Sequence, residues 1–214
     1  MLEPLNYTEL RIVNMGVISN GTTLLDAGAL DSGVATGSMT LISTQTASNS
    51  ATISFTSGID STYKEYVFKF INVHPATNST MFGFQVDTAT NTNYNQTITS
   101  TLFNAAHAEG DTETIFSYQT TMDQHQGTAF QKLANNTGNE NDECISGTLT
   151  IFDPSNTNFA KHFIGRMNEV HNENYSFDTY SAGYVNTTTA ITRAQFKFES
   201  GNIDSGTIKL YGVK

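Results

Sequence analysis

Apolar and polar residues alternate with a period of two along most of this chain, and this pattern limits what it can fold into. Within Thr80–Val86, for example, Phe82, Phe84 and Val86 fall on one face. Strict alternation is the pattern of a β-strand that buries one face. The pattern predicts ten strands, over residues 39–44, 51–56, 66–73, 80–86, 97–103, 145–152, 160–170, 175–185, 191–199 and 207–211.

Short polar linkers separate these strands. They are rich in Asn, Asp, Gly, Ser and Thr, and they cover residues 87–95, 135–143, 153–158 and 201–206. Such residues favour turns, because their side chains bond nearby backbone and Gly accepts positive φ. About ten strands without intervening helices predict an all-β, antiparallel β-sandwich of jelly-roll type. Residues 123–133 fit either a strand or a short helix.

The start of the chain differs from the rest. The chain has 214 residues, which suits one domain with an extension. Residues 15–37 are rich in Gly, Ala and Asp, and they precede the first regular strand. We therefore expect an extended N-terminal arm over 1–37, which docks on its own domain or on a neighbouring subunit, and a sandwich over 38–214. Both Met1 and Met15 fit as the native start.

The composition favours a thin core with a polar, weakly charged surface. The hydrophobic fraction is 37%, and Ser, Thr and Asn make up 72 of the 214 residues. Charged residues are 14%, against about a quarter in ordinary domains. The core must then come from apolar stripes on strands, while hydroxyl and amide groups solvate the surface.

The charge balance excludes several function classes. Ten Lys and Arg stand against 20 Asp and Glu, for a net charge of −10. A nucleic-acid partner needs cations to neutralise phosphates, and docking on anionic membranes needs basic clusters. No run approaches the 18 apolar residues of a membrane helix, and the first residues lack the pattern of a secretory signal. The single cysteine, Cys144, allows no intrachain disulfide, which fits assembly in a reducing cytoplasm, and pairing between two chains is the alternative.

No metal or cofactor motif stands out. The five histidines are scattered without the spacing of a zinc site, at positions His74, His107, His125, His162 and His171. The loop Asn135–Glu143 offers carboxylate and amide oxygens of the kind that bind calcium, but it lacks the EF-hand order. We expect no cofactor, and calcium is the metal to test first.

The sequence argues against an enzyme. A glycosidase needs two carboxylates across one cleft. The candidates are Glu109, Asp111, Glu169 and Asp178, which any acidic sandwich would supply. No G-x-S-x-G elbow is present. We expect a non-enzymatic protein, with glycan hydrolysis as the weakest alternative.

Tyrosines near loops and strand edges are the candidate binding residues. The four singled out are Tyr94, Tyr118, Tyr175 and Tyr180. Tyrosine has an apolar ring and a polar tip, so it suits both the rim of a core and a glycan-binding platform. A carbohydrate-binding module is therefore an alternative, although the chain has no Trp for sugar stacking.

One block and the last strand together resemble small structural proteins of tailed, particularly marine, bacteriophages. The block reads T-A-S-N-S-A-T-I-S-F at residues 46–55, then I-D-S-T-Y and H-P-A-T, and the end reads G-T-I-K-L-Y-G at 206–212. The leader V-I-S-N-G-T-T-L-L-D at 17–26 is similar to the start of such proteins. The resemblance covers most of the chain from Met15, while residues 1–14 depart from it.

The resemblance implies a virion component that displays a β-sandwich on the particle surface and carries no catalytic residues. Tail fibre or tail-tip adhesion to a host-surface glycan is slightly favoured over capsid decoration. The implied partners are other virion proteins, bound through the N-terminal arm, and further copies of the chain, with a trimer favoured. We expect no nucleic-acid partner and no membrane insertion. The protein would be assembled in the host cytoplasm and located in the virion.

Overall fold

The computed structural model describes residues 17–19, 22–26, 29–30 and 38–214 of the chain. It divides into two units, Met1–Ser38 and Met39–Lys214. In the first unit, β1 (Val17–Ser19), β2 (Thr22–Asp26) and β3 (Ala29–Leu30) pair antiparallel in the order β1-β2-β3. The predicted docking role of the arm falls mostly on residues outside those described, and it stays a prediction.

The second unit contains thirteen antiparallel strands in one hydrogen-bonded network. They are β4 (Met39–Thr46), β5 (Ile53–Phe55), β6 (Glu65–Pro75), β7 (Thr80–Thr88), β8 (Ile98–Ala108), β9 (Thr114–Tyr118), β10 (His125–Gly127), β11 (Gln131–Thr137), β12 (Ile145–Phe152), β13 (Lys161–His171), β14 (Tyr175–Val185), β15 (Ile191–Phe198) and β16 (Ile203–Val213). In the described part of the chain, no helix is long and apolar enough to cross a membrane.

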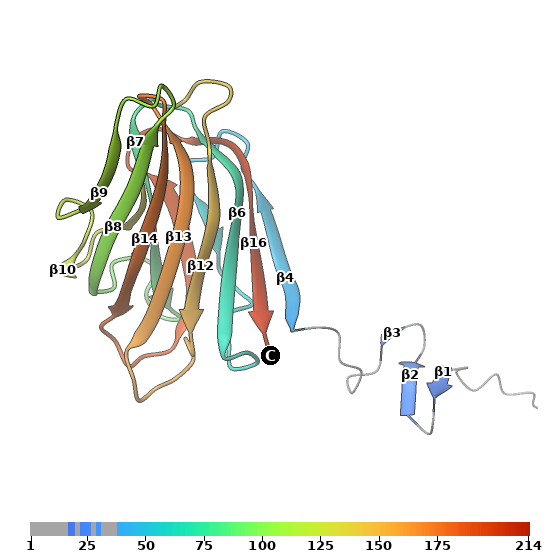
Figure 1. The fold of residues 1–214 in the computed structure, drawn as a ribbon. Coiled ribbons are helices and arrows are strands. Elements are labelled where there is room, and N and C mark those ends of the chain that lie inside the picture. Colours follow the sequence, from blue (N-terminus) through green and yellow to red (C-terminus); the bar gives the residue numbers. More distant parts are fainter. Residues whose placement is uncertain (1–16, 20–21, 27–28, 31–37) are drawn as a thin grey trace, which may run out of the picture. The chain divides into compact units, whose positions relative to one another are not determined.

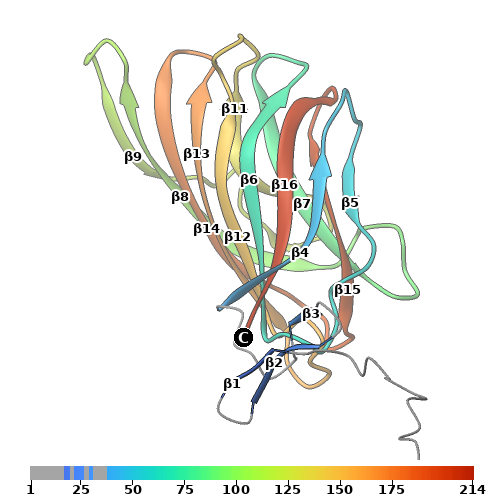
Figure 2. The same ribbon diagram turned by 90° about the vertical axis from the view of Figure 1, so that its right-hand side faces the viewer.

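The strands form two layers. The large sheet has the order β4-β16-β6-β12-β13-β14-β8, with β9 and β10 both paired along the far edge of β8 (Figure 1). The small sheet has the order β11-β7-β15-β5 and forms the second layer (Figure 2). The end of β11 joins the layers, because Thr137 pairs with His171 on β13. The predicted all-β sandwich is therefore confirmed.

Most connections between consecutive strands cross from one sheet to the other. The chain alternates between the layers from β4 to β8, and again from β14 to β16. Two runs of consecutive strands stay in the large sheet. They are β8, β9 and β10 along one edge, and β12, β13 and β14, which form a meander with long regular pairing. This connectivity is that of a sandwich of jelly-roll type.

Phenylalanine rings fill the space between the sheets. Phe196, from the centre of the small sheet, packs against Phe68 and Phe70 of the large sheet at centroid distances of 4.9 and 5.1 Å. All three rings are buried, and both contacts are edge-to-face, which suits the charge distribution of aromatic rings. Alternate residues of β6 and β15 thus bury one face of each strand, as the sequence predicts, and the residues between them face outward.

The structure has three more strands in the sandwich than the ten predicted. Residues 123–133 contain β10 and the start of β11, so the helix alternative is wrong. The strand β9 was missed because its alternation spans only five residues, all at least partly exposed. Edge strands bury little, and their apolar pattern is correspondingly weak.

Three predicted linkers are partly strand. The linker 87–95 begins with the last two residues of β7. The first residues of the linker 135–143 belong to β11. There the backbone N–H of Asn135 donates to the buried carboxylate of Glu169 at 2.7 Å. A buried polar partner allows a polar segment to lie in a sheet, which sequence alternation alone does not reveal. The linker 201–206 overlaps the start of β16, where the register is irregular and Gly206 has a φ of 118°.

Candidate functional site

The outer face of the large sheet carries a continuous row of aromatic side chains. The strand register places Arg166 on β13 opposite Tyr180 on β14, Tyr180 opposite Phe103 on β8, and Phe103 opposite Tyr118 on β9. These residues alternate with buried ones, so their side chains leave the sheet on the solvent side. We call Tyr180, Phe103, Tyr118 and the adjacent Phe116 the aromatic row.

The rings of this row stack sideways across the strands. Tyr180 and Phe103 are parallel within 7°, with centroids 5.0 Å apart, and Phe116 lies 5.6 Å from Phe103 at a tilt. The guanidinium of Arg166 covers the other face of Tyr180 at 4.9 Å from the ring centroid. Exposure rises outward, from 38% for Phe103 to 50% for Tyr118 and 77% for Phe116. A contiguous exposed aromatic surface is typical of a binding site.

A polar hollow lies beside Arg166. Its guanidinium donates to both carboxylate oxygens of Asp178, at 2.9 and 2.7 Å. These hydrogen bonds from Arg166 lower the pKa of Asp178, and the same contact raises the pKa of Arg166. The hollow has a volume of about 310 Å³, and its lining residues are Ser146, Gly147, Thr148, Arg166, Asn168 and Asp178. It offers hydroxyl, amide and charged groups within one strand spacing of the aromatic row.

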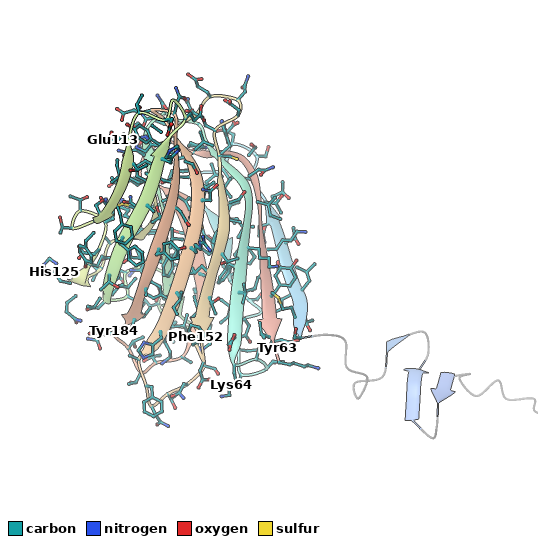
Figure 3. The ribbon with its side chains drawn as sticks, viewed as in Figure 1. Tyr63, Lys64, Glu113, His125, Phe152 and Tyr184 are labelled. Carbon is teal, nitrogen blue, oxygen red and sulfur yellow. The ribbon has the colours of Figure 1, made fainter. Side chains whose placement is uncertain are left out.

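An apolar hollow lies on the other side of the row. Ile164, Ala182 and Thr101 pair across β13, β14 and β8, and they are smaller than the aromatic residues beside them. Tyr184 and Phe152 stand at the same end of their strands (Figure 3). With His162, Ile164 and neighbouring backbone they line a hollow of about 450 Å³. The outer face therefore has an aromatic ridge with a hollow on each side.

The structure brings together two of the four predicted tyrosines. Tyr118 and Tyr180 belong to the aromatic row. Tyr175 is the first residue of β14, away from the row. Its hydroxyl donates to Glu113 at 2.9 Å, and this contact raises the pKa of Tyr175. Tyr94 lies in the loop after β7, where its amide donates to Asp87. A contact role for any of the four stays a prediction.

The sequence reading missed the phenylalanines of the row. A signal for Phe103 was present, because it directly follows Leu102, which shares the period of two with Ile98 and is buried. Adjacent residues in a strand point to opposite faces, so a buried Leu102 places Phe103 outside. Phe116 had no comparable signal, because its strand is short and borders the sheet.

The candidate carboxylates do not share a cleft. Glu169 points into the core, where it accepts hydrogen bonds from Asn135 and Thr137, whereas Asp178 lies on the outer face. Burial raises the pKa of Glu169 to about 8, which its two hydrogen bonds only partly offset. Asp111 lies in the loop after β8 and contacts His107 at 3.1 Å. Glu109 lies in the same loop as Asp111. Glu169 and Asp178 thus lack the shared cleft that a two-carboxylate mechanism uses.

The loop considered for calcium folds onto itself. The carboxylate of Glu143 accepts a hydrogen bond from the amide of Glu140 at 2.6 Å, and Glu143 is buried against the loop. Within the described residues, His, Cys, Asp and Glu side chains form no group of three or more that could hold a metal ion. His162 and His171 lie at opposite ends of β13, the first exposed and the second buried.

Comparisons with protein-family models, with curated proteins and with solved structures found no match to this chain.

Proposed function

We propose that this protein is a non-enzymatic structural component of a bacteriophage particle, and that it contacts a host-surface glycan through the outer face of the large sheet. The virion assignment rests on the sequence resemblance. The single observation that supports glycan contact is the aromatic row, with its polar hollow at Arg166 and Asp178. Aromatic surface combined with fixed hydrogen-bonding groups is the usual composition of a small-ligand site.

Self-association is part of this proposal. Among the described strands, β4 pairs only with β16 and β5 pairs only with β15, so each leaves one backbone edge without a strand. Open edges favour pairing with another chain unless they are covered. A homo-oligomer, with a trimer favoured, would cover them, and docking of residues 1–37 on virion proteins would fix its orientation. Sedimentation equilibrium of the whole chain measures the oligomer directly.

Glycan binding is tested with the purified whole chain on a glycan array. We expect binding that falls about tenfold in Phe116→Ala, which corresponds to about 1.4 kcal/mol. Phe159→Ala is the matched control, because Phe159 is 69% exposed in the loop between β12 and β13, outside the row. Equal loss in both variants, or an array without any bound glycan, would refute contact through this face.

The virion location needs a separate test. Antibodies against the chain should label purified particles, and electron microscopy would show whether the label lies on the tail or on the capsid. Label on the capsid alone would favour decoration over adhesion. A protein that binds glycans but is absent from particles would instead be a stand-alone carbohydrate-binding protein, which uses the same surface chemistry.

A further inference from the structure

The outer face of the large sheet reverses the charge of the chain. The whole chain has a net charge of −10. Apart from the irregular start of β16, the outward-facing charged side chains of this sheet are Lys69, Arg166, Lys209, Glu65 and Asp178. Arg166 and Asp178 neutralise each other, so Lys69 and Lys209 stand against Glu65 alone, an excess of one positive charge on the strands of a strongly acidic protein. A further carboxylate, Asp123, lies at the far end of the aromatic row, where it accepts a hydrogen bond from the hydroxyl of Tyr118 at 2.6 Å.

Two of the cations lie directly opposite each other. Lys209 on β16 pairs with Lys69 on β6 in the strand register. Like charges in this position repel each other and destabilise a sheet. Lys69 lies 5.5 Å from the ring centroid of Tyr211, and among residues 38–214 neither lysine forms an ion pair with a carboxylate. On the small sheet, by contrast, Lys132 pairs with Glu199 at 2.9 Å.

The lysine pair continues into the aromatic row. The register gives one line of side chains across seven strands, in the order Lys209, Lys69, Thr148, Arg166, Tyr180, Phe103 and Tyr118. At roughly 4.8 Å between strands, this line is about 29 Å long. Its length suits an extended polymer rather than a single small molecule.

We infer that the outer face of the large sheet binds an anionic polysaccharide, whose carboxylate or sulfate groups contact Lys69 and Lys209 while its sugar rings lie along Arg166 and the aromatic row. This inference rests on the proposed function and names its ligand class. The two opposed lysines gain a counter-charge when such a ligand binds, which relieves their repulsion. The hydroxyl groups of Ser146 and Thr148 can share hydrogen bonds with sugar hydroxyls.

Charge complementarity favours a polysaccharide over the other anionic polymers. Duplex DNA carries a charge every 1.7 Å, and tight binding needs many cations together with an approach that a net charge of −10 opposes. A membrane surface is broad, whereas the cations here form a single line. DNA and phosphatidylserine vesicles therefore serve as competing probes.

The test uses matched pairs of probes on the whole chain. Polygalacturonate is compared with its methyl ester, and dextran sulfate with dextran, by biolayer interferometry. We expect the charged member of at least one pair to bind at least about tenfold more tightly, and about 0.5 M salt to weaken it by screening. Lys69→Gln/Lys209→Gln should abolish most of that preference. Lys132→Gln/Lys197→Gln, which removes the same charge from the small sheet, should retain it.

The outcomes separate this inference from the proposed function. Equal binding of charged and neutral members would overturn the inference and leave glycan contact in place. Binding of DNA or vesicles in preference to both polyanions would also overturn it. If no polysaccharide binds here or on the glycan array, both proposals fall. Thermal unfolding checks the variants, because Lys69→Gln relieves repulsion and should leave the melting temperature unchanged or raised.

Discussion

Tyr180 on β14 and Phe103 on β8 stand ring against ring on the outer face of the large sheet, with centroids 5.0 Å apart and planes within 7° of parallel. The register places them directly opposite each other. Each ring covers one face of the other, so both gain contact area while their edges remain in solvent. The pair therefore contributes to the sheet and to its exposed surface at the same time.

This stacking predicts an energetic coupling between the two residues. A double-mutant cycle with Tyr180→Ala and Phe103→Ala should give a coupling free energy of about 0.5–1.5 kcal/mol in urea unfolding. The control cycle combines Tyr180→Ala with Phe159→Ala, and these two changes should add. Additivity in both cycles would show that the stacked pair is not formed in solution.

Phe196 should be among the most costly core positions. Its ring contacts Phe55, Phe68, Phe70 and Phe82, so truncation removes contacts from both sheets. Phe196→Ala should lower the free energy of unfolding by about 3–5 kcal/mol. Phe159→Ala should change it by less than about 0.5 kcal/mol, because that ring is already exposed. Similar losses in the two variants would contradict the placement of the core.

The glycine that opens the final G-T-I-K-L-Y-G segment is required by backbone geometry. Gly206 has a φ of 118°, and a Cβ there would lie 2.6 Å from the Asn72 carbonyl oxygen and from the Cα of Val73. Gly206→Ala should therefore cost at least roughly 2 kcal/mol in urea unfolding. Gly110→Ala is the control, since the nearest atom would be at an ordinary 3.6 Å. A neutral Gly206→Ala would contradict the structure of this bulge.

Glu169 should make the protein less stable as the pH rises. Burial raises its pKa to about 8, above the ordinary value of 4.5, so the folded state holds a proton that the unfolded state releases. The contribution of Glu169 to the free energy of unfolding is highest below about pH 4.5, and it decreases as the pH rises to about 8. Glu169→Gln removes the titrating carboxyl group and keeps an oxygen that can accept the hydrogen bond from the backbone N–H of Asn135. The variant should gain roughly 2–4 kcal/mol over the wild type between pH 5 and pH 9.

The control for this pH profile is Glu113→Gln, which makes the same chemical change at an exposed site. Urea unfolding at successive pH values measures the difference between variant and wild type. An advantage of Glu169→Gln that grows toward low pH would mean that the buried carboxylate is stabilised in its charged form.

The sequence predicted the sandwich because its central strands bury alternate large apolar residues. The alternating positions of Phe82, Phe84 and Phe196 indicate both the strands and the face of each strand that is buried. The edge strand β9 was not predicted, since it buries little. The polar end of β11 was predicted as a linker, since its place in the sheet depends on the buried carboxylate of Glu169. Local alternation predicts which face of a strand is buried. It does not predict which strands or side chains from distant segments contact that strand.

The candidate site was predicted only in part for a related reason. Tyr118 and Tyr180 were singled out, but nothing local places them in one line with Phe103. The opposition of Lys69 and Lys209 is likewise set by the pairing of β6 with the last strand of the chain. Register between distant strands follows from packing of the whole core, so it becomes visible only in the folded structure.

The most direct measurement is a map of the surface that the ligand contacts. Amide chemical shifts of the labelled chain would be followed while dextran sulfate is added. We expect the largest shifts along one line from Lys209 and Lys69 through Arg166 to Phe103, with small shifts in β5, β7 and β15. Shifts confined to the small sheet, or no shifts at saturating polysaccharide, would contradict the claim that the outer face of the large sheet is the binding surface.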